Sequence, residues 1–99
     1  MNLILNQMDL SALPNSRLME QARTILDGLS NGESHHQHQG KRMHYDRAVI
    51  SIPIGYRYRL LLLCLKGRYV PLEIMSHEQY NNTKTIQQRV KHSKQYWSH

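Results

Sequence analysis

The sequence predicts an α+β fold: a small antiparallel-type sheet of three to four strands with an N-terminal helix packed on one face. Apolar residues recur at helical spacing between residues 17 and 29, whereas three apolar runs between residues 50 and 76 have the lengths and boundaries of strands. With 99 residues the chain has room for one modest core. We therefore expect one compact domain at residues 1–82, followed by a basic tail or helix at residues 83–99.

The predicted helix follows a clear stop in the sequence. Pro14 ends the preceding segment, and Asn15 or Ser16 can cap the helix that begins there. Gly32 is the expected terminator. The apolar face consists of Leu18, Ala22, Ile25, Leu26 and Leu29. Residues 1–13 are apolar enough to join the core, either as a strand around residues 3–5 or as a helical turn.

Three strands are expected between residues 50 and 76. The first, residues 50–54, alternates with a period of two, and because Pro53 cannot donate to a ladder, this strand lies at an edge or ends there. The second, Leu60 to Leu65, is continuously apolar, which is typical of a strand buried on both faces. Lys66-Gly67 then predicts a hairpin into residues 69–76, so the second and third strands should be antiparallel neighbours.

The polar segment 30–40 has no periodicity and is expected to be a loop or partly disordered. It contains His35, His36 and His38, and His44 follows. Histidines this close can bind a transition metal, but no cysteine or carboxylate pattern completes such a site. We therefore expect no metal and no other cofactor.

The charge is distributed unevenly along the chain. Residues 1–40 hold two basic residues against four acidic ones, a net charge of −2, whereas residues 41–99 hold eleven against three, a net charge of +8. Clustered lysine and arginine attract polyanions. Nucleic acid is therefore the leading expected partner, and an acidic partner protein is the alternative.

No window of the sequence approaches the roughly 18 apolar residues of a membrane helix, and the first residues do not resemble a secretion signal. We expect a soluble, cytoplasmic protein without a membrane partner. The single cysteine, Cys64, lies inside the apolar run, where it is expected to pack as a small hydrophobe.

Basic residues approach the first predicted strand, interleaved with an aromatic one. Interleaved cations and rings suit a surface that follows a single-stranded nucleic acid, although the segment 41–47 is equally compatible with a solvated edge strand. The candidate RNA-binding residues are Lys41, Arg42, Arg47, Arg57 and, in the tail, Lys84.

Two motifs in this order resemble the RelE/ParE toxin superfamily. Tyr58-Arg59 enters the central apolar strand, as the arginine-bearing strand of RelE-like toxins does. The strand end Ile74-Met75-Ser76-His77-Glu78-Gln79-Tyr80 is similar to that of YafQ-like and HigB-like relatives. The resemblance covers residues 16–82 and implies a RelE/ParE-like fold.

The resemblance also implies a function. A toxin of this superfamily is the toxin of a type II toxin–antitoxin system and cuts mRNA, usually on the ribosome, until its cognate antitoxin silences it. The implied chemistry needs no metal: the ribose 2′-hydroxyl attacks the adjacent phosphate and leaves a 2′,3′-cyclic phosphate. DNA would be contacted only indirectly, through a toxin–antitoxin complex.

The candidate catalytic residues are Arg59, His77, Tyr80 and His44. Arg59 would offset the phosphorane charge, because a guanidinium pairs with two phosphate oxygens and stays charged. His77 is the candidate general acid or base, Tyr80 would stack on a base or bond the phosphate, and His44 is a weaker candidate for a second proton carrier. Each has a structural alternative: Arg59 as a surface residue, His77 as a turn residue, and Tyr80 packed on the sheet.

The sequence departs from RelE where paired lysines are expected. Ile50 and Ile52 occupy the aligned positions, so the base role falls to His44, Asp46 or residues near His77. This departure favours an alternative, a ParE-like inhibitor of DNA gyrase. A non-catalytic RNA- or protein-binding module of the same fold is a third hypothesis.

Overall fold

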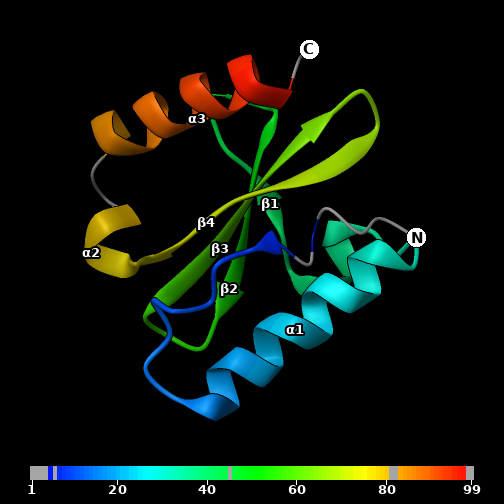
Figure 1. The fold of residues 1–99 in the computed structure, drawn as a ribbon, viewed down its shortest axis with the longest axis vertical. Helices are drawn as coiled ribbons and strands as arrows, with labels where there is room; N and C mark the ends of the chain where they lie inside the picture. The colour runs from blue at the N-terminus through cyan, green and yellow to red at the C-terminus, as the bar shows by residue number, and fades with distance from the viewer. Residues whose placement is uncertain (1–4, 6, 45, 81–82, 98–99) are drawn as a thin grey trace.

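The computed structural model describes residues 5, 7–44, 46–80 and 83–97, without the side chains of residues 79, 80, 83–85 and 97. Its elements are α1 (Ser16–Ser30), the 3₁₀ turn η2 (His35–His38), β1 (Lys41–Arg42), β2 (Val49–Ile54), β3 (Tyr58–Leu65), β4 (Arg68–Ser76), α2 (His77–Tyr80) and α3 (Thr83–Trp97). The predicted α+β class is confirmed (Figure 1). The strand considered around residues 3–5 lies largely outside the described residues, and Leu5 itself is buried in the core.

The four strands form one antiparallel sheet in the order β1-β2-β3-β4. The predicted hairpin between β3 and β4 is confirmed: Lys66 and Gly67 have φ values of 54° and 78°. Positive φ at both central residues suits a tight turn whose twist matches that of the strands. β2 ends at Ile54, one residue after Pro53, and it lies between β1 and β3. Of the two predicted alternatives, the second is confirmed: the strand ends directly after Pro53, whereas the two-residue β1 forms the edge of the sheet.

Helix α1 begins and ends where the sequence predicted. Asn15 is its N-cap, and the side-chain oxygen of Asn15 accepts the N–H of Leu18 at 3.0 Å. At the other end the N–H of Asn31 donates to the Asp27 carbonyl at 3.0 Å, and Gly32 follows with a φ of 99°. Glycine adopts this left-handed conformation without strain, so it stops the helix.

The segment 30–40 is more ordered than predicted. Ser34 caps the turn η2: its Oγ accepts the N–H of His36 at 3.2 Å, and its own N–H donates to Gln37 Oε1 at 2.8 Å. His35, at the start of the turn, is buried against Tyr69 of β4. The segment is a loop, as predicted, and local caps and a distant tyrosine order one short turn within it.

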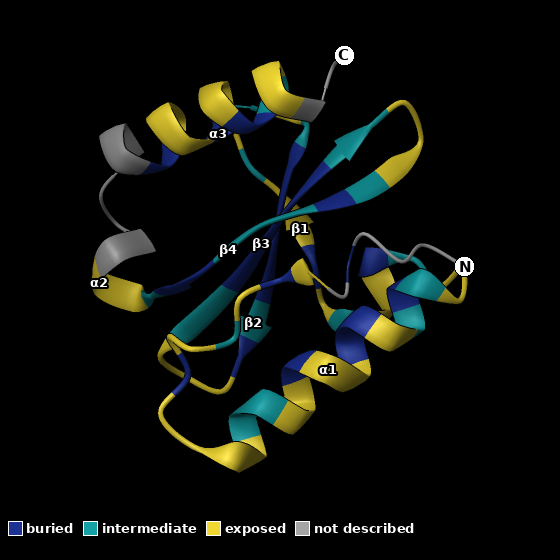
Figure 2. Ribbon diagram, in the orientation of Figure 1, coloured by how far each residue is buried: buried dark blue, intermediate teal, exposed yellow. Residues whose placement is uncertain are grey.

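Helices cover both faces of the sheet, and Figure 2 shows that α1 and α3 turn their buried residues toward it. Alternate strand residues belong to two separate clusters. The cluster on the α1 side contains Ile50, Ile52, Ile54, Leu60, Leu62 and Ile74, and the cluster on the α3 side contains Val49, Leu61, Leu63, Val70 and Met75 with Ile86 and Val90 of α3. The prediction that the central strand is buried on both faces is confirmed. Cys64 packs against the α1-side cluster.

An irregularity in β4 affects the α3 side of the sheet. Leu61 pairs with Glu73, but Leu62 pairs with Pro71, which leaves Leu72 as an extra residue. Such a bulge bends a strand and resets its alternation. As a result, two consecutive residues face α3: Leu72 packs with the α3-side cluster, and Glu73 also contacts α3.

The helices of the described residues include none with the length and apolar character needed to span a membrane.

Candidate functional site

Arg59 and His77 lie at the same end of the sheet. Arg59 is near the start of β3, and its register partner is Met75, near the end of β4. His77 begins α2 two residues later, and its backbone N–H donates to the Arg57 carbonyl at 2.6 Å. The His77 side chain is exposed. The β3–β4 hairpin therefore brings an arginine and an accessible imidazole to one end of the domain.

The Arg59 side chain belongs to the α3 side of the sheet. It alternates with Tyr58 and Leu60, which pack on the α1 side, and it shares its face with Leu61 and Met75. Arg59 is partly buried there. The arginine and the α3 helix thus occupy the same side of the sheet.

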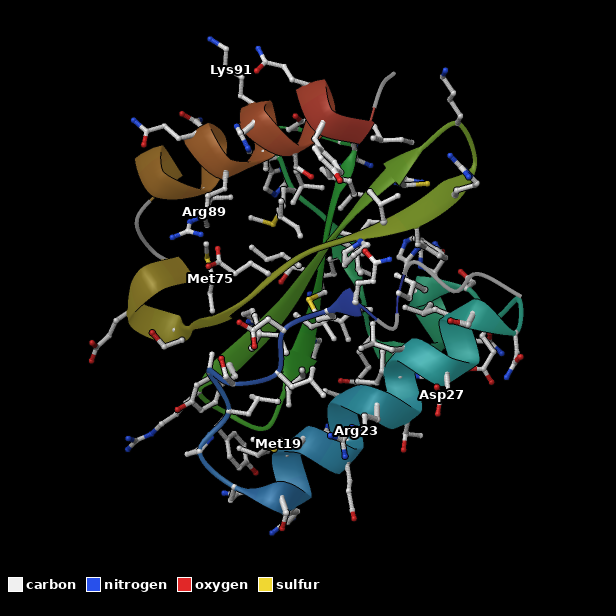
Figure 3. All side chains as sticks on the ribbon, in the orientation of Figure 1. Met19, Arg23, Asp27, Met75, Arg89 and Lys91 are labelled. Carbon is white, nitrogen blue, oxygen red and sulfur yellow. The ribbon has the colours of Figure 1, made fainter. Side chains whose placement is uncertain are left out.

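An ion pair joins β4 to α3 on this side. Arg89 Nη1 lies 2.7 Å from Glu73 Oε1, and Figure 3 shows Arg89 reaching from α3 toward the sheet near Met75. Glu73 lies two residues before Met75, so it is a diagonal neighbour of Arg59, and such neighbours lie about 7–8 Å apart. A carboxylate therefore stands beside the candidate arginine.

The environment of Glu73 is unusual for a carboxylate. Burial raises its pKa above the ordinary 4.5; the Arg89 charge opposes this rise, and Asp9 adds to it. Its second oxygen, Oε2, is buried and has no hydrogen-bond partner within the described part of the chain. A buried oxygen without a partner and a raised pKa are both features of groups that take part in proton transfer.

A second buried polar atom lies on the same side. Ser51 pairs with Leu61 on one flank and with Lys41 on the other, so the three residues share a face with Glu73. Ser51 is buried, and its Oγ also finds no partner among the described residues. The α3 side of the sheet therefore combines unpaired polar atoms with basic side chains.

The two positions at which the resemblance led us to expect lysines lie on the opposite side. Ile50 and Ile52 are fully buried in the α1-side cluster. The β2 residues that share the face of Arg59 are Val49, Ser51 and Pro53, because strand residues alternate between faces. β2 thus offers no lysine on that face, and the nearest one in register is Lys41 of β1.

The structure separates His44 and Arg47 from Arg59 and His77. β2 runs antiparallel to β3, so the segment between β1 and β2 lies at the end of the sheet where β3 finishes. At that end Arg42 donates to the Arg47 carbonyl at 2.7 Å, and Lys94 of α3 donates to Asp46 at 2.5 Å. Burial would raise the pKa of Asp46, but the bonds from Lys94 and Ala48 and the Lys94 charge lower it below its usual value. The Asp46 carboxylate is therefore held by hydrogen bonds at the opposite end of the sheet from Arg59.

The other candidate residues are Arg57, Tyr80 and Lys84. Arg57 is exposed at the same end as Arg59. Tyr80 ends α2 and Lys84 lies in the first turn of α3, but the side chains of both fall outside the described residues.

Two histidines of the η2 turn have other partners. His38 Nε2 bonds Glu33 Oε1 at 2.8 Å, and His35 turns to Tyr69. Within the described ranges, no group of three or more histidine, cysteine or acidic residues could hold a metal ion.

Glu73 and Arg89 are the residues that sequence reasoning missed. Glu73 is a charged residue within the predicted strand at residues 69–76, and this position could have marked it as a candidate. Nothing in the pattern of residues 83–97 distinguishes Arg89 from the other basic residues of that segment, because its pairing with Glu73 is a tertiary contact.

The fold is therefore a small α+β domain in which one sheet lies between helical layers, with Arg59 and His77 at one end. A family model described as the ParE-like toxin domain matches residues 16–82. The chain therefore belongs to the ParE-like toxin family, which confirms the predicted superfamily and implies a cognate antitoxin. Searches among curated proteins and among solved structures gave no match.

Proposed function

We propose that this toxin is a metal-free endoribonuclease that cuts mRNA, with the ribosome as the setting of cleavage. The observation that supports this proposal most strongly is the register of the β3–β4 hairpin, which sets Arg59 and His77 at one end of the sheet. A cation and a side chain that can exchange a proton are two requirements for this kind of phosphoryl transfer.

The reaction follows from these groups. A base removes the proton of a ribose 2′-hydroxyl, whose oxygen attacks the adjacent phosphorus. The bond to the 5′-oxygen breaks, and an acid protonates that leaving oxygen, which yields a 2′,3′-cyclic phosphate and a free 5′-hydroxyl. Arg59 offsets the charge that develops on the phosphate oxygens, because its guanidinium can bond two of them together.

In this proposal Glu73 removes the proton of the 2′-hydroxyl, and His77 protonates the leaving oxygen. His77 is exposed at the end of β4, so it can reach a bound strand. Glu73 is the candidate base that replaces the missing lysines, since it stands on the face of Arg59 and its pKa is raised by burial. The reaction needs one acid and one base, and these two side chains are the candidates for the two roles.

The experiment compares induced expression of wild type, His77→Ala and Arg59→Ala in bacteria, with RNA 5′ ends mapped alongside growth. We expect new 5′-hydroxyl ends and growth arrest in the wild type, and a loss of about 10²- to 10⁴-fold in cleavage for His77→Ala. His44→Ala and Arg47→Ala are matched controls, because they change an exposed histidine and an exposed arginine at the other end of the sheet.

Three results would contradict the proposal. Growth arrest without new RNA ends would favour another target. New ends that persist in both site variants but vanish in His44→Ala would place the site at the opposite end. Binding of RNA or of a partner protein without any cleavage would favour a non-catalytic module.

Inhibition of DNA gyrase is the second candidate function. It is favoured by the match to a ParE-like toxin domain and by the absence of a lysine from β2 on the face of Arg59. A gyrase inhibitor would cause DNA damage on induction and block supercoiling by purified gyrase. Its toxicity would persist in His77→Ala, since no proton transfer is needed.

A further inference from the structure

A groove of about 550 Å³ lies between the start of α1 and the β2–β3 turn. Its walls include Pro14, Arg17 and Leu18 from the α1 end and Tyr56, Arg57 and Tyr58 from the turn. The volume falls within the range of roughly 300–1,000 Å³ that is usual for small-ligand sites. The groove lies on the α1 side of the sheet, where Tyr58 packs, and so it is separate from the face of Arg59.

The glycine of the turn sets the shape of this groove. Gly55 has a φ of 59°, which favours glycine, and a Cβ added there would come within 3.1 Å of Leu18 Cδ2. The turn therefore approaches α1 closely at Gly55 and holds the next residues, Tyr56 and Arg57, at the groove wall.

The groove has a positive charge. Arg17 and Arg57 come from different parts of the chain and both are exposed, and none of the described residues that line the groove is acidic. Within the described part of the chain, neither arginine forms an ion pair with a carboxylate. Two guanidinium groups without carboxylate partners are complementary to an anionic occupant, and they match phosphate oxygens in particular.

An aromatic ring stands beside these charges. Tyr56 is fully exposed, which is unusual for a large aromatic side chain. Tyr58, which also lines the groove, is partly buried. Rings next to arginines suit single-stranded nucleic acid, because bases stack on the rings while the backbone phosphates contact the cations.

The groove and the proposed cleavage site meet at the β2–β3 turn. Arg57 is one of the residues that line the groove, and its carbonyl accepts the backbone N–H of His77. A strand bound near His77 can therefore continue over the turn into the groove. We propose that this groove binds single-stranded RNA flanking the cleaved bond. This placement rests on the proposed ribonuclease function, whereas the affinity of the groove for RNA does not.

The test measures binding of a labelled single-stranded RNA to the full-length chain by fluorescence anisotropy. The protein carries His77→Ala, so that the RNA stays intact and the protein can be produced. Tyr56→Ala should weaken binding roughly 5- to 100-fold. Arg17→Gln should weaken it and reduce the slope of log K against log salt by about 0.7, as expected for one lost contact to a single strand. Tyr56→Phe should bind like the parent, because the ring remains.

Two matched controls test the location. Tyr96→Ala removes the other exposed tyrosine that the structure describes, on α3, and Arg23→Gln removes an exposed arginine of α1 outside the groove. Both should bind RNA like the parent. Circular dichroism should be unchanged in every variant, since each altered side chain is exposed.

The outcomes separate this inference from the proposed function. If His77→Ala abolishes cleavage but the groove variants bind RNA normally, the groove proposal is overturned and the ribonuclease proposal stands. If the wild type cuts no RNA but the groove variants lose affinity for it, the ribonuclease proposal is overturned and the groove binds RNA for another purpose. If the groove variants lose affinity only for the antitoxin, the occupant is a protein segment and the inference is wrong.

Discussion

The hydroxyl of Tyr69 accepts the backbone N–H of His35 at 3.0 Å and lies 2.8 Å from Nδ1 of the same histidine. The two residues are 34 positions apart, and their rings meet edge to face with centroids 5.8 Å apart. One hydroxyl thus fixes both the backbone and the ring of a buried histidine. This contact joins the η2 turn to the edge strand β4.

Removal of that hydroxyl should loosen the turn. Tyr69→Phe leaves the His35 N–H and Nδ1 without their partner, and an unsatisfied buried polar group costs about 1–3 kcal/mol. We expect the free energy of unfolding to fall by about 1–2 kcal/mol in urea titrations, with faster hydrogen exchange at residues 34–40. Tyr96→Phe is the control, because that tyrosine is exposed. Equal stability of Tyr69→Phe and wild type would contradict this account.

The stability of the domain should depend on pH through His35. Burial lowers the pKa of His35 below its ordinary 6.5, and the charges of His36 and Arg42 lower it further. The folded state therefore favours the neutral ring, so this contribution to stability is complete above about pH 6.5 and is lost as the pH falls through the lowered pKa.

The measurement is the urea midpoint between pH 7.5 and pH 5. The midpoint of the wild type should fall over this range, and His35→Gln, although less stable, should show a smaller fall. His92→Gln, which changes an exposed histidine of α3, should follow the wild type. An equally steep fall in His35→Gln would assign the pH dependence to other groups.

Glu73 gives a prediction about activity. If it acts as the base, Glu73→Gln should lower the cleavage rate about 10²- to 10⁴-fold with little change in KM. Because its pKa is raised above 4.5, the ionised form accumulates only as the pH rises through that higher value, so the wild-type rate should increase with pH above 4.5. That increase should be absent in the residual activity of Glu73→Gln.

Glu78→Gln is the matched control for this experiment. It removes an exposed carboxylate from α2, next to His77 in the chain. Full activity in Glu73→Gln, or an equal loss in both variants, would show that Glu73 is not the base.

The sequence predicted the elements well because their signals are local. Asn15 and Gly32 mark the bounds of α1, and Lys66-Gly67 has the backbone freedom that the β3–β4 turn requires. Its prediction that Arg59 and His77 share an end of the sheet needed only the direction of two adjacent strands. Such inferences depend on neighbours in the chain, and they succeeded for that reason.

It was harder to predict from the sequence which face of the sheet a strand residue occupies and which distant side chains contact each other. A shift of one residue in a strand moves a side chain to the other face, and the positions where the resemblance led us to expect lysines, Ile50 and Ile52, face the core. The burial of His35 depends on Tyr69, and the environment of Glu73 depends on Arg89. Neither partner is near in sequence, and no periodic pattern connects them.

The interruption of β4 at Pro71 and Leu72 has a consequence for self-association. β4 is the outermost strand on one side of the sheet, and the opposite outer strand, β1, is only two residues long. An uninterrupted outer strand is a template on which further copies can add and grow into fibrils. Proline offers no N–H to an incoming chain, and the bulge breaks the repeat that such growth requires. We therefore expect concentrated solutions of this protein to resist fibril formation.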